Sequence, residues 1–138
     1  MDLDLNLNLG LARHLGMKFL EATPERVLAE LEIREEVCTL GGAIHGGSLM
    51  ALADTAGAVG TLAFLEKNPD AGKGTATLES KTNFFAAARA GKVRAESTPL
   101  HKGRRTHVWQ VAAHDEQGRK LGLATLTQLV IELREEAL

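Results

Sequence analysis

The sequence lacks most of the features by which several classes of protein are recognised. It has one cysteine, Cys38, so no disulfide can form within the chain, and no Cys/His cluster has the spacing of a zinc site. Its net charge is −2, so no excess of basic residues indicates binding to nucleic acid or to an anionic membrane. The opening segment "MDLDLNLNLG" has neither the cationic region nor the apolar run of a signal peptide. We therefore expect a cytoplasmic protein that binds no metal.

Long apolar runs are absent as well. A membrane-spanning helix needs about 18 or more consecutive apolar residues. The most apolar segment, residues 46–65, is interrupted by one Asp, three Ser or Thr and four Gly, which favours a buried helix in a globular protein. With 138 residues, 44% of them hydrophobic, the chain can bury a core of its own. We expect a single domain over residues 1–138, in which residues 1–9 are frayed.

Strand patterns predominate outside that segment. The leucines at positions 3, 5, 7 and 9 alternate as in a strand, and residues 9–15 are expected to form a short helical turn. In residues 16–33 we expect two strands joined at 23–25, because apolar and polar residues alternate in the second of them. Four more strands are predicted at residues 74–85, 92–101, 106–115 and 120–133, and a Gly-rich loop at residues 35–47 precedes the helix. This order predicts an α+β fold, an antiparallel sheet of five or six strands wrapped around one long central helix.

The predicted helix has two different sides when its residues are projected at about 100° each. One side is apolar and is expected to pack into the sheet; it carries Leu49, Leu52, Ala56, Val59 and Ala63. The other side consists mostly of small residues, so another group can approach the helix closely there; it carries Gly47, Met50, Asp54, Gly57, Ala58 and Thr61.

Asp54 is the only charged residue between His45 and Glu66. An aspartate is unfavourable in the middle of a helix and costly to bury without a partner. Two interpretations are open. The side chain either faces solvent or bonds a backbone group, or it lies in a partly desolvated crevice where it is suited to act as a general base or nucleophile. The apolar flanking residues favour the second interpretation.

The triplet His45-Gly46-Gly47 stands where the helix begins. The first turn of a helix has unpaired backbone N–H groups, and glycines let a ligand oxygen reach them, as in an oxyanion hole. Glycine also serves as an ordinary helix cap, and His45 can act as a base, brace the loop or orient a substrate. Gly46 and Asp54 are about 12 Å apart along a helix, too far to serve one carbonyl. If both are catalytic, the site is shared between two antiparallel helices of a two-fold dimer.

Three segments, "GxxHGGSLMALADTAG", "TATLESKTNFFAAARAGKVRAES" and the "KGRR" turn, resemble the hotdog-fold acyl-CoA thioesterases, and most closely the phenylacetate-degradation and 4-hydroxybenzoyl-CoA thioesterase-like branch. The resemblance covers about residues 10–132. It implies a hotdog fold and homodimers joined edge to edge with shared active sites, often paired again into homotetramers. It also implies hydrolysis of an acyl-CoA or aryl-CoA thioester to the free acid and CoA, so that CoA is part of the substrate and no cofactor is expected.

The resemblance also implies roles for single residues. Asp54 corresponds to the family's acid and acts as base or nucleophile, while the amide of Gly46 or Gly47 polarises the thioester carbonyl. His45 arranges the loop, and Thr77 has its hydroxyl near the attacking water. A sixth position departs from the family pattern: many relatives have Asn six residues before the His, where this chain has Thr39, and we expect it to contact the substrate or water.

The phosphates of CoA need cations. The segment "HKGRR" offers Lys102, Arg104 and Arg105 on a tight turn, and Arg89 lies near another turn. Arginine binds phosphate through two parallel hydrogen bonds, so these four residues are the predicted phosphate contacts; the alternative is a solvated hairpin. Trp109 and the pair at 84–85 are expected in the core or an interface rather than against a ligand.

Two other functions compete with thioester hydrolysis. A hotdog hydratase or dehydratase also uses a His and an acid, but such relatives usually carry a His-Phe-Pro-Gly run, which is absent here. A non-catalytic acyl-CoA-binding module is the second alternative, and the intact Asp54 argues against it.

Overall fold

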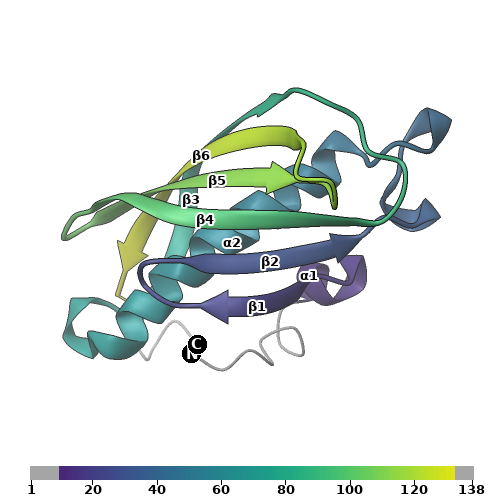
Figure 1. The fold of residues 1–138 in the computed structure, drawn as a ribbon. Coiled ribbons are helices and arrows are strands. Elements are labelled where there is room, and N and C mark those ends of the chain that lie inside the picture. Colours follow the sequence, from purple (N-terminus) through teal and green to yellow (C-terminus); the bar gives the residue numbers. More distant parts are fainter. Residues whose placement is uncertain (1–9, 133–138) are drawn as a thin grey trace.

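The computed structural model describes residues 10–132, in which a six-stranded antiparallel sheet wraps around one long helix (Figure 1). The leucine alternation at positions 3–9 and the frayed segment predicted there lie outside the described residues. The strands are β1 (Lys18–Ala22), β2 (Val27–Glu32), β3 (Gly74–Phe84), β4 (Lys92–Lys102), β5 (Thr106–His114) and β6 (Lys120–Ile131). The helices are α1 (Gly10–Leu15) and α2 (Gly46–Lys67), with short 3-10 turns η2 (Glu35–Val37), η3 (Leu40–Gly42) and η4 (Pro69–Ala71).

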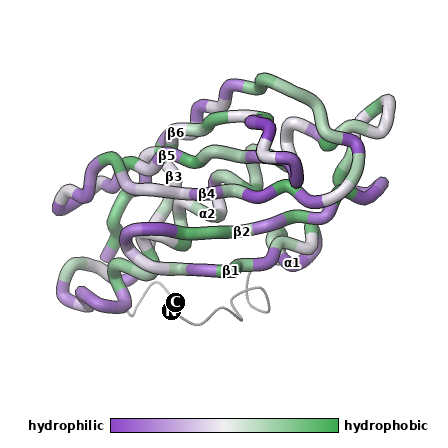
Figure 2. The backbone as a smooth tube through the Cα atoms, in the orientation of Figure 1, coloured by the Kyte–Doolittle hydropathy of each residue, from purple (hydrophilic) through white to green (hydrophobic). Residues whose placement is uncertain are grey.

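The strand order is β1-β2-β4-β5-β6-β3, which leaves β1 and β3 at the two edges of the sheet. The α+β prediction and the central helix are confirmed, and the number of strands is six. The Gly-rich loop is more ordered than predicted, since it contains η2 and η3 and an isolated bridge between Cys38 and Ile44. Figure 2 shows that the middle of β2 is hydrophobic, whereas the hairpin turns are mostly hydrophilic.

The apolar side of α2 packs into the sheet as predicted. Its members are at most 5% exposed; they are Leu49, Leu52, Ala56, Val59 and Ala63. The prediction for the opposite side is wrong in part, because Gly57 and Thr61 are buried as well. The sheet curls far enough around the helix for β5 and β6 to reach them: a Cβ at Gly57 would lie 2.5 Å from Leu126 Cδ1, and one at Gly60 would overlap the Trp109 ring. Glycine permits this close approach.

The helix is long and apolar enough to cross a membrane by length and composition alone. However, 61% of its most apolar 18-residue stretch is buried inside the structure. This burial is that of the core helix of a globular fold, as the interrupting polar residues and glycines predict.

Candidate active site

Asp54 lies in the middle of α2, is half-buried, and faces β3. The hydroxyl of Thr77 on β3 donates a hydrogen bond of 2.6 Å to Asp54 Oδ1. The structure thus brings two of the predicted site residues together, and Asp54 is bonded to a side chain rather than to the backbone. Its second oxygen, Oδ2, accepts no hydrogen bond within residues 10–132. Asp54 also lines an apolar cavity of about 240 Å³ with Leu11, Ala12, Ala58 and Leu62.

Behind Thr77 lies a second layer of polar groups. Gln128 of β6 is fully buried, and its Nε2 donates to Thr77 Oγ1 at 2.7 Å. Its Oε1 lies 3.0 Å from Thr75 Oγ1, whose one proton can go to this oxygen or to the Leu129 carbonyl at 2.9 Å. The sequence analysis did not single out Gln128. The available signal was its place in the strand: Ala124, Leu126 and Gln128 occupy alternate positions, and the first two are buried against the helix, so a polar residue at the third points inward too.

The start of α2 provides one free backbone donor. His45 is the N-cap of the helix, and its Nδ1 accepts a 2.7 Å hydrogen bond from the Gly47 N–H. The cap therefore occupies one of the two amides that were predicted to polarise a carbonyl. The other amide, that of Gly46, has no acceptor among the described residues. It lies in a cavity of about 380 Å³ that includes Phe84 and Phe85.

The three aromatic side chains considered above differ in burial. Trp109 is fully buried, which confirms the prediction that it belongs to the core. Phe84 and Phe85 are 50% and 57% exposed in the single chain, so they are not core residues. A Cβ at Gly46 would lie 3.3 Å from the Phe84 ring, which shows how closely this ring packs on the helix start.

The four predicted phosphate contacts do not lie together within one chain. Arg89 lines a cavity of about 850 Å³ with Thr39 and His45, at the N-terminal end of α2, and its Nε donates to the Gly41 carbonyl at 3.3 Å. Arg104 and Arg105 lie near η4, beyond the C-terminal end of the same helix; Asp70 and Glu132 line their cavity. A helix of 22 residues is about 33 Å long.

Lys102 has contacts of its own, apart from the two arginines of its hairpin. Its Nζ donates to the Pro24 carbonyl at 3.1 Å, lies 3.8 Å from the Glu25 carboxylate, and is 5.7 Å from the centre of the Phe64 ring. These contacts tie the β4–β5 hairpin to the turn between β1 and β2. Lys102 therefore does not line the cavity of Arg104 and Arg105, although all three lie near the C-terminal end of α2.

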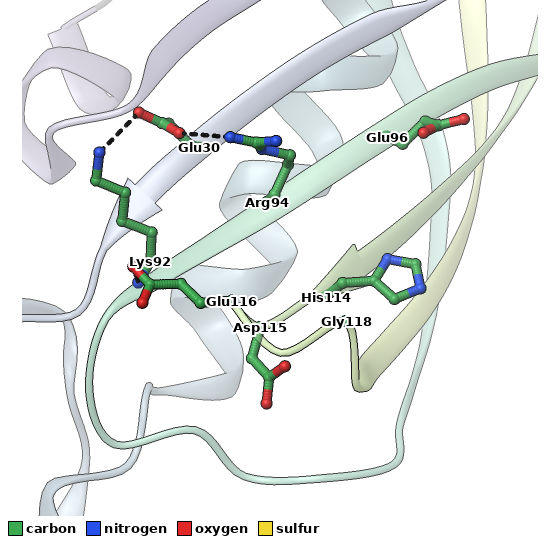
Figure 3. A pocket seen from close by; sticks show the side chains of 8 residues that line it. All are labelled: Glu30, Lys92, Arg94, Glu96, His114, Asp115, Glu116 and Gly118. Carbon is green, nitrogen blue, oxygen red and sulfur yellow. Dashed lines mark hydrogen bonds and ion pairs between the residues drawn. The ribbon is translucent and has the colours of Figure 1, made fainter.

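A second charged pocket lies on β2, β4 and the β5–β6 turn (Figure 3). Lys92 and Arg94 of β4 both pair with Glu30, at 3.3 and 3.4 Å. Further acids line the pocket, among them Glu96 and Asp115, so its charge does not suit phosphate. Glu30 alternates with apolar residues along β2, yet it is only 7% exposed, since Lys92 and Arg94 pair with it.

A buried histidine completes the polar groups under the helix. His107 of β5 is fully buried, and its Nδ1 lies 3.1 Å from the hydroxyl of Thr61, which also accepts from Trp109 Nε1 at 2.9 Å. Its Nε2 has no partner among the described residues. Burial lowers the pKa of His107, and the positive charge of Lys102 lowers it further. Both effects favour the neutral form of the side chain.

Known proteins share this sequence and architecture. The chain matches the thioesterase superfamily over residues 41–121. It is 30% identical over 118 residues to the proofreading thioesterase EntH of Klebsiella pneumoniae, covering 82% of this chain and 83% of that protein. It is 29% identical over 127 residues to the 1,4-dihydroxy-2-naphthoyl-CoA hydrolase of Listeria monocytogenes, covering 92% and 100%.

A solved structure agrees with these relatives. The crystal structure of a thioesterase from Haemophilus influenzae superposes with a TM-score of 0.88 at 30% identity, covering 98% of this chain and 94% of that one. The match to the family covers more than half of the chain, and the fold agrees over nearly all of it. The predicted fold and enzyme class are therefore confirmed: the chain belongs to the thioesterase superfamily, with the hotdog fold, and is a thioester hydrolase.

Proposed function

We propose that the chain hydrolyses acyl-CoA thioesters with Asp54 as the general base. The observation that carries this proposal is the 2.6 Å bond from Thr77 to Asp54 Oδ1, which leaves Oδ2 without a partner among residues 10–132. Oδ2 takes a proton from water while the water oxygen bonds to the thioester carbon, and the carbonyl oxygen gains negative charge. The C–S bond then breaks, and the CoA sulfur leaves and receives the proton. A free backbone N–H stabilises the oxyanion.

Each site needs two chains under this proposal. Gly46 and Asp54 are about 12 Å apart along α2, whereas an amide donor and a base must both lie within about 3 Å of the reacting carbonyl or its water. A second chain running antiparallel would supply the partner's Gly46 opposite Asp54. The exposed edge of β3 supports such an arrangement, because β3 pairs with β6 on one side only among the described residues, and its other edge, 11 residues long, is a ready surface for another copy.

Two contacts within one chain support a position for the two-fold axis. Asp54 bonds Thr77, and the helix start at Gly46 packs on Phe84. The helix and the strand therefore run antiparallel between these two contacts. A two-fold axis that brings Gly46 of one chain opposite Asp54 of the other must lie midway between the two contacts, both along the helix and along the strand.

On the helix this midpoint is Met50, which is 39% exposed. On the strand it falls at Lys81: the bulge between Thr77 and Glu79 adds one residue, and on β6 Thr125, the partner of Lys81, lies midway between the partners of Thr77 and Phe84. Leu78, close by on the same strand, is 59% exposed. An apolar surface next to the axis favours burial by the partner. We further propose that such dimers pair into tetramers.

For the phosphates of CoA we propose Arg104 and Arg105. Within the described part of the chain their guanidinium groups have no bonded partner, whereas Lys102 and Arg89 already donate to backbone carbonyls. Free guanidinium groups suit phosphate, which accepts two parallel hydrogen bonds. Thr39 lies with Arg89 at the other end of the helix, and we propose it for water or substrate contacts.

A panel of aromatic, medium-chain and long-chain acyl-CoAs, followed by release of free thiol, tests the proposed function. The relatives lead us to include an aryl-CoA, because one of them is named as a 1,4-dihydroxy-2-naphthoyl-CoA hydrolase. At least one substrate should release thiol well above the rate of a matched Asp54→Asn preparation. Thiol release at the rate of that variant for every substrate would refute the proposal.

A further inference from the structure

Two side-chain hydrogen bonds lead from the fully buried Gln128 to Asp54. Gln128 Nε2 donates to Thr77 Oγ1 at 2.7 Å, and Thr77 Oγ1 donates to Asp54 Oδ1 at 2.6 Å. On the other side of the amide, Oε1 lies 3.0 Å from Thr75 Oγ1. Gln128 does not touch the carboxylate, so any effect on Asp54 passes through Thr77.

The chemistry of the four groups allows one direction for these bonds while Asp54 is ionised. A carboxylate only accepts, so the single proton of the Thr77 hydroxyl goes to Asp54 Oδ1. Thr77 Oγ1 must then accept from Gln128, and only the amide nitrogen Nε2 can donate. The opposite orientation of the amide would place Oε1 against Thr77, whose one proton would face two acceptors. An acceptor left without a donor in this buried place is unfavourable.

The Thr75 hydroxyl behind the amide is compatible with this orientation. Its one proton can go to Gln128 Oε1 at 3.0 Å or to the Leu129 carbonyl at 2.9 Å, so the orientation rests on the ionised Asp54. The cross-strand pairing of Thr77 with Gln128 holds the two residues opposite each other on β3 and β6. The strand bulge directly after Thr77 shifts the register, and the pairing continues with Glu79 opposite Thr127. Backbone pairing and side-chain bonding thus agree on one arrangement.

We propose that Gln128 is a positioning residue for the catalytic base. It holds the Thr77 hydroxyl as a donor to Asp54 Oδ1, so that Oδ2 faces the substrate water. This inference rests on the proposed function of Asp54 and adds a residue to it. Its role is in the chemical step rather than in substrate binding, so kcat depends on it and KM does not.

A double-mutant cycle tests the inference. Gln128→Met keeps the approximate volume and removes the donor, and we expect kcat to fall about fivefold with KM unchanged, as for a lost hydrogen bond in a charged site. Thr77→Val removes the hydroxyl through which Gln128 acts. In that background Gln128→Met should change kcat less than twofold, because residues acting through one group are not additive. Equal losses in both backgrounds, or no loss in wild type, would overturn the proposal.

Matched controls separate positioning from packing. Gln110→Met makes the same change on β5, at a position that alternates with the buried Trp109 and Val111, and kcat should stay at the wild-type value. If Gln128→Met does not fold, Gln128→Glu takes its place in the cycle: it keeps the shape but offers Thr77 an acceptor, and we expect a loss of more than fivefold.

A spectroscopic measurement distinguishes failure of this inference from failure of the proposed function. If wild-type protein releases no thiol from any acyl-CoA, the proposed function fails, while the ¹³C signal of the Asp54 carboxylate still reports on its hydrogen bond. That signal should move in Gln128→Met and stay in place in Gln110→Met. An Asp54 signal that ignores Gln128→Met would overturn the positioning role whether or not the protein is active.

Discussion

The hydroxyl of Thr77 lies 2.6 Å from Asp54 Oδ1, although the two residues belong to different elements and are 23 positions apart in the chain. This contact joins the central helix to an edge strand of the sheet. It places the base beside the one edge where, under the proposed function, a second chain would be added.

Replacing Asp54 by Asn tests the base directly. The substitution keeps the shape and removes the proton acceptor, so kcat should fall at least about a hundredfold, as for loss of a general base. Thiol release at saturating acyl-CoA measures the effect, and circular dichroism and gel filtration check that the variant is folded and assembled. Activity close to that of wild type in such a preparation would assign the base to another group.

Complementation between two inactive variants tests the shared site. Asp54→Asn lacks the base, and Gly46→Pro lacks the amide donor at a helix position where proline is tolerated. His45 is in the extended conformation that a following proline requires. In a mixed dimer one site would combine the intact base of one chain with the intact amide of the other.

Random exchange should form about half mixed dimers with one good site of two, so about a quarter of wild-type activity should return. Subunit exchange is verified with differently tagged chains. Mixed dimers without activity would mean that each chain carries its own complete site.

Disulfide cross-linking tests the position of the axis. Directly opposite residues of antiparallel strands have Cα atoms about 4.5–5.5 Å apart, a distance that a disulfide can bridge. Lys81→Cys, in a Cys38→Ser background, should therefore form dimers under oxidation on a non-reducing gel. Thr125→Cys is the matched control, because it is exposed and pairs with Lys81 on the inner neighbour β6. Two copies of it would lie about 10 Å farther apart, so cross-linking of both variants alike would disprove this axis.

Removal of the free arginines tests the phosphate site. Arg104→Ala combined with Arg105→Ala should raise KM about tenfold and leave kcat nearly unchanged, since phosphate binding is similar in the ground and transition states. Arg89→Ala serves as the comparison, because its side chain already donates to the Gly41 carbonyl. An increase of KM in Arg89→Ala alone would move the nucleotide to the other end of α2.

The buried His107 predicts how stability depends on pH. Burial lowers its pKa in the folded protein, while the unfolded chain has a pKa of about 6.5. Below that pH the unfolded state binds a proton that the folded state resists, so the free energy of unfolding should fall as the pH decreases from 6.5 towards the lowered pKa, and should not change with this group above it. His107→Gln should reduce the difference in stability between pH 7.5 and pH 5, as measured by urea unfolding. An unchanged difference would exclude His107 as its source.

The sequence is most informative where one element carries its own signal: the central helix and its start are confirmed, and the role of Asp54 stays a prediction. Asp54 stands out because it is the only charge within an apolar helix, and the glycines at 46 and 47 mark the helix start without any knowledge of the sheet. Pairing across the sheet gives no such local signal. Gln128 and His107 acquire their partners only when β3, β5 and β6 are placed in register, so their importance is visible in the structure and not in the sequence pattern.

Neighbours in sequence also proved poor guides to neighbours in space. Lys102 and Arg104 are two positions apart, yet the lysine turns to the Pro24 carbonyl while the arginine lies near η4. Closeness in the sequence therefore does not show that two cationic side chains line the same cavity.

The contact between Gly60 and the Trp109 ring limits which substitutions are tolerated at these two positions during evolution. No side chain fits at position 60 while the indole remains, and the indole is held by its bond to Thr61 at 2.9 Å. Mutation at either position alone produces an overlap or a void, both of which destabilise a packed core. The two positions are thus expected to covary among relatives, with a larger residue at 60 accompanying a smaller one at 109.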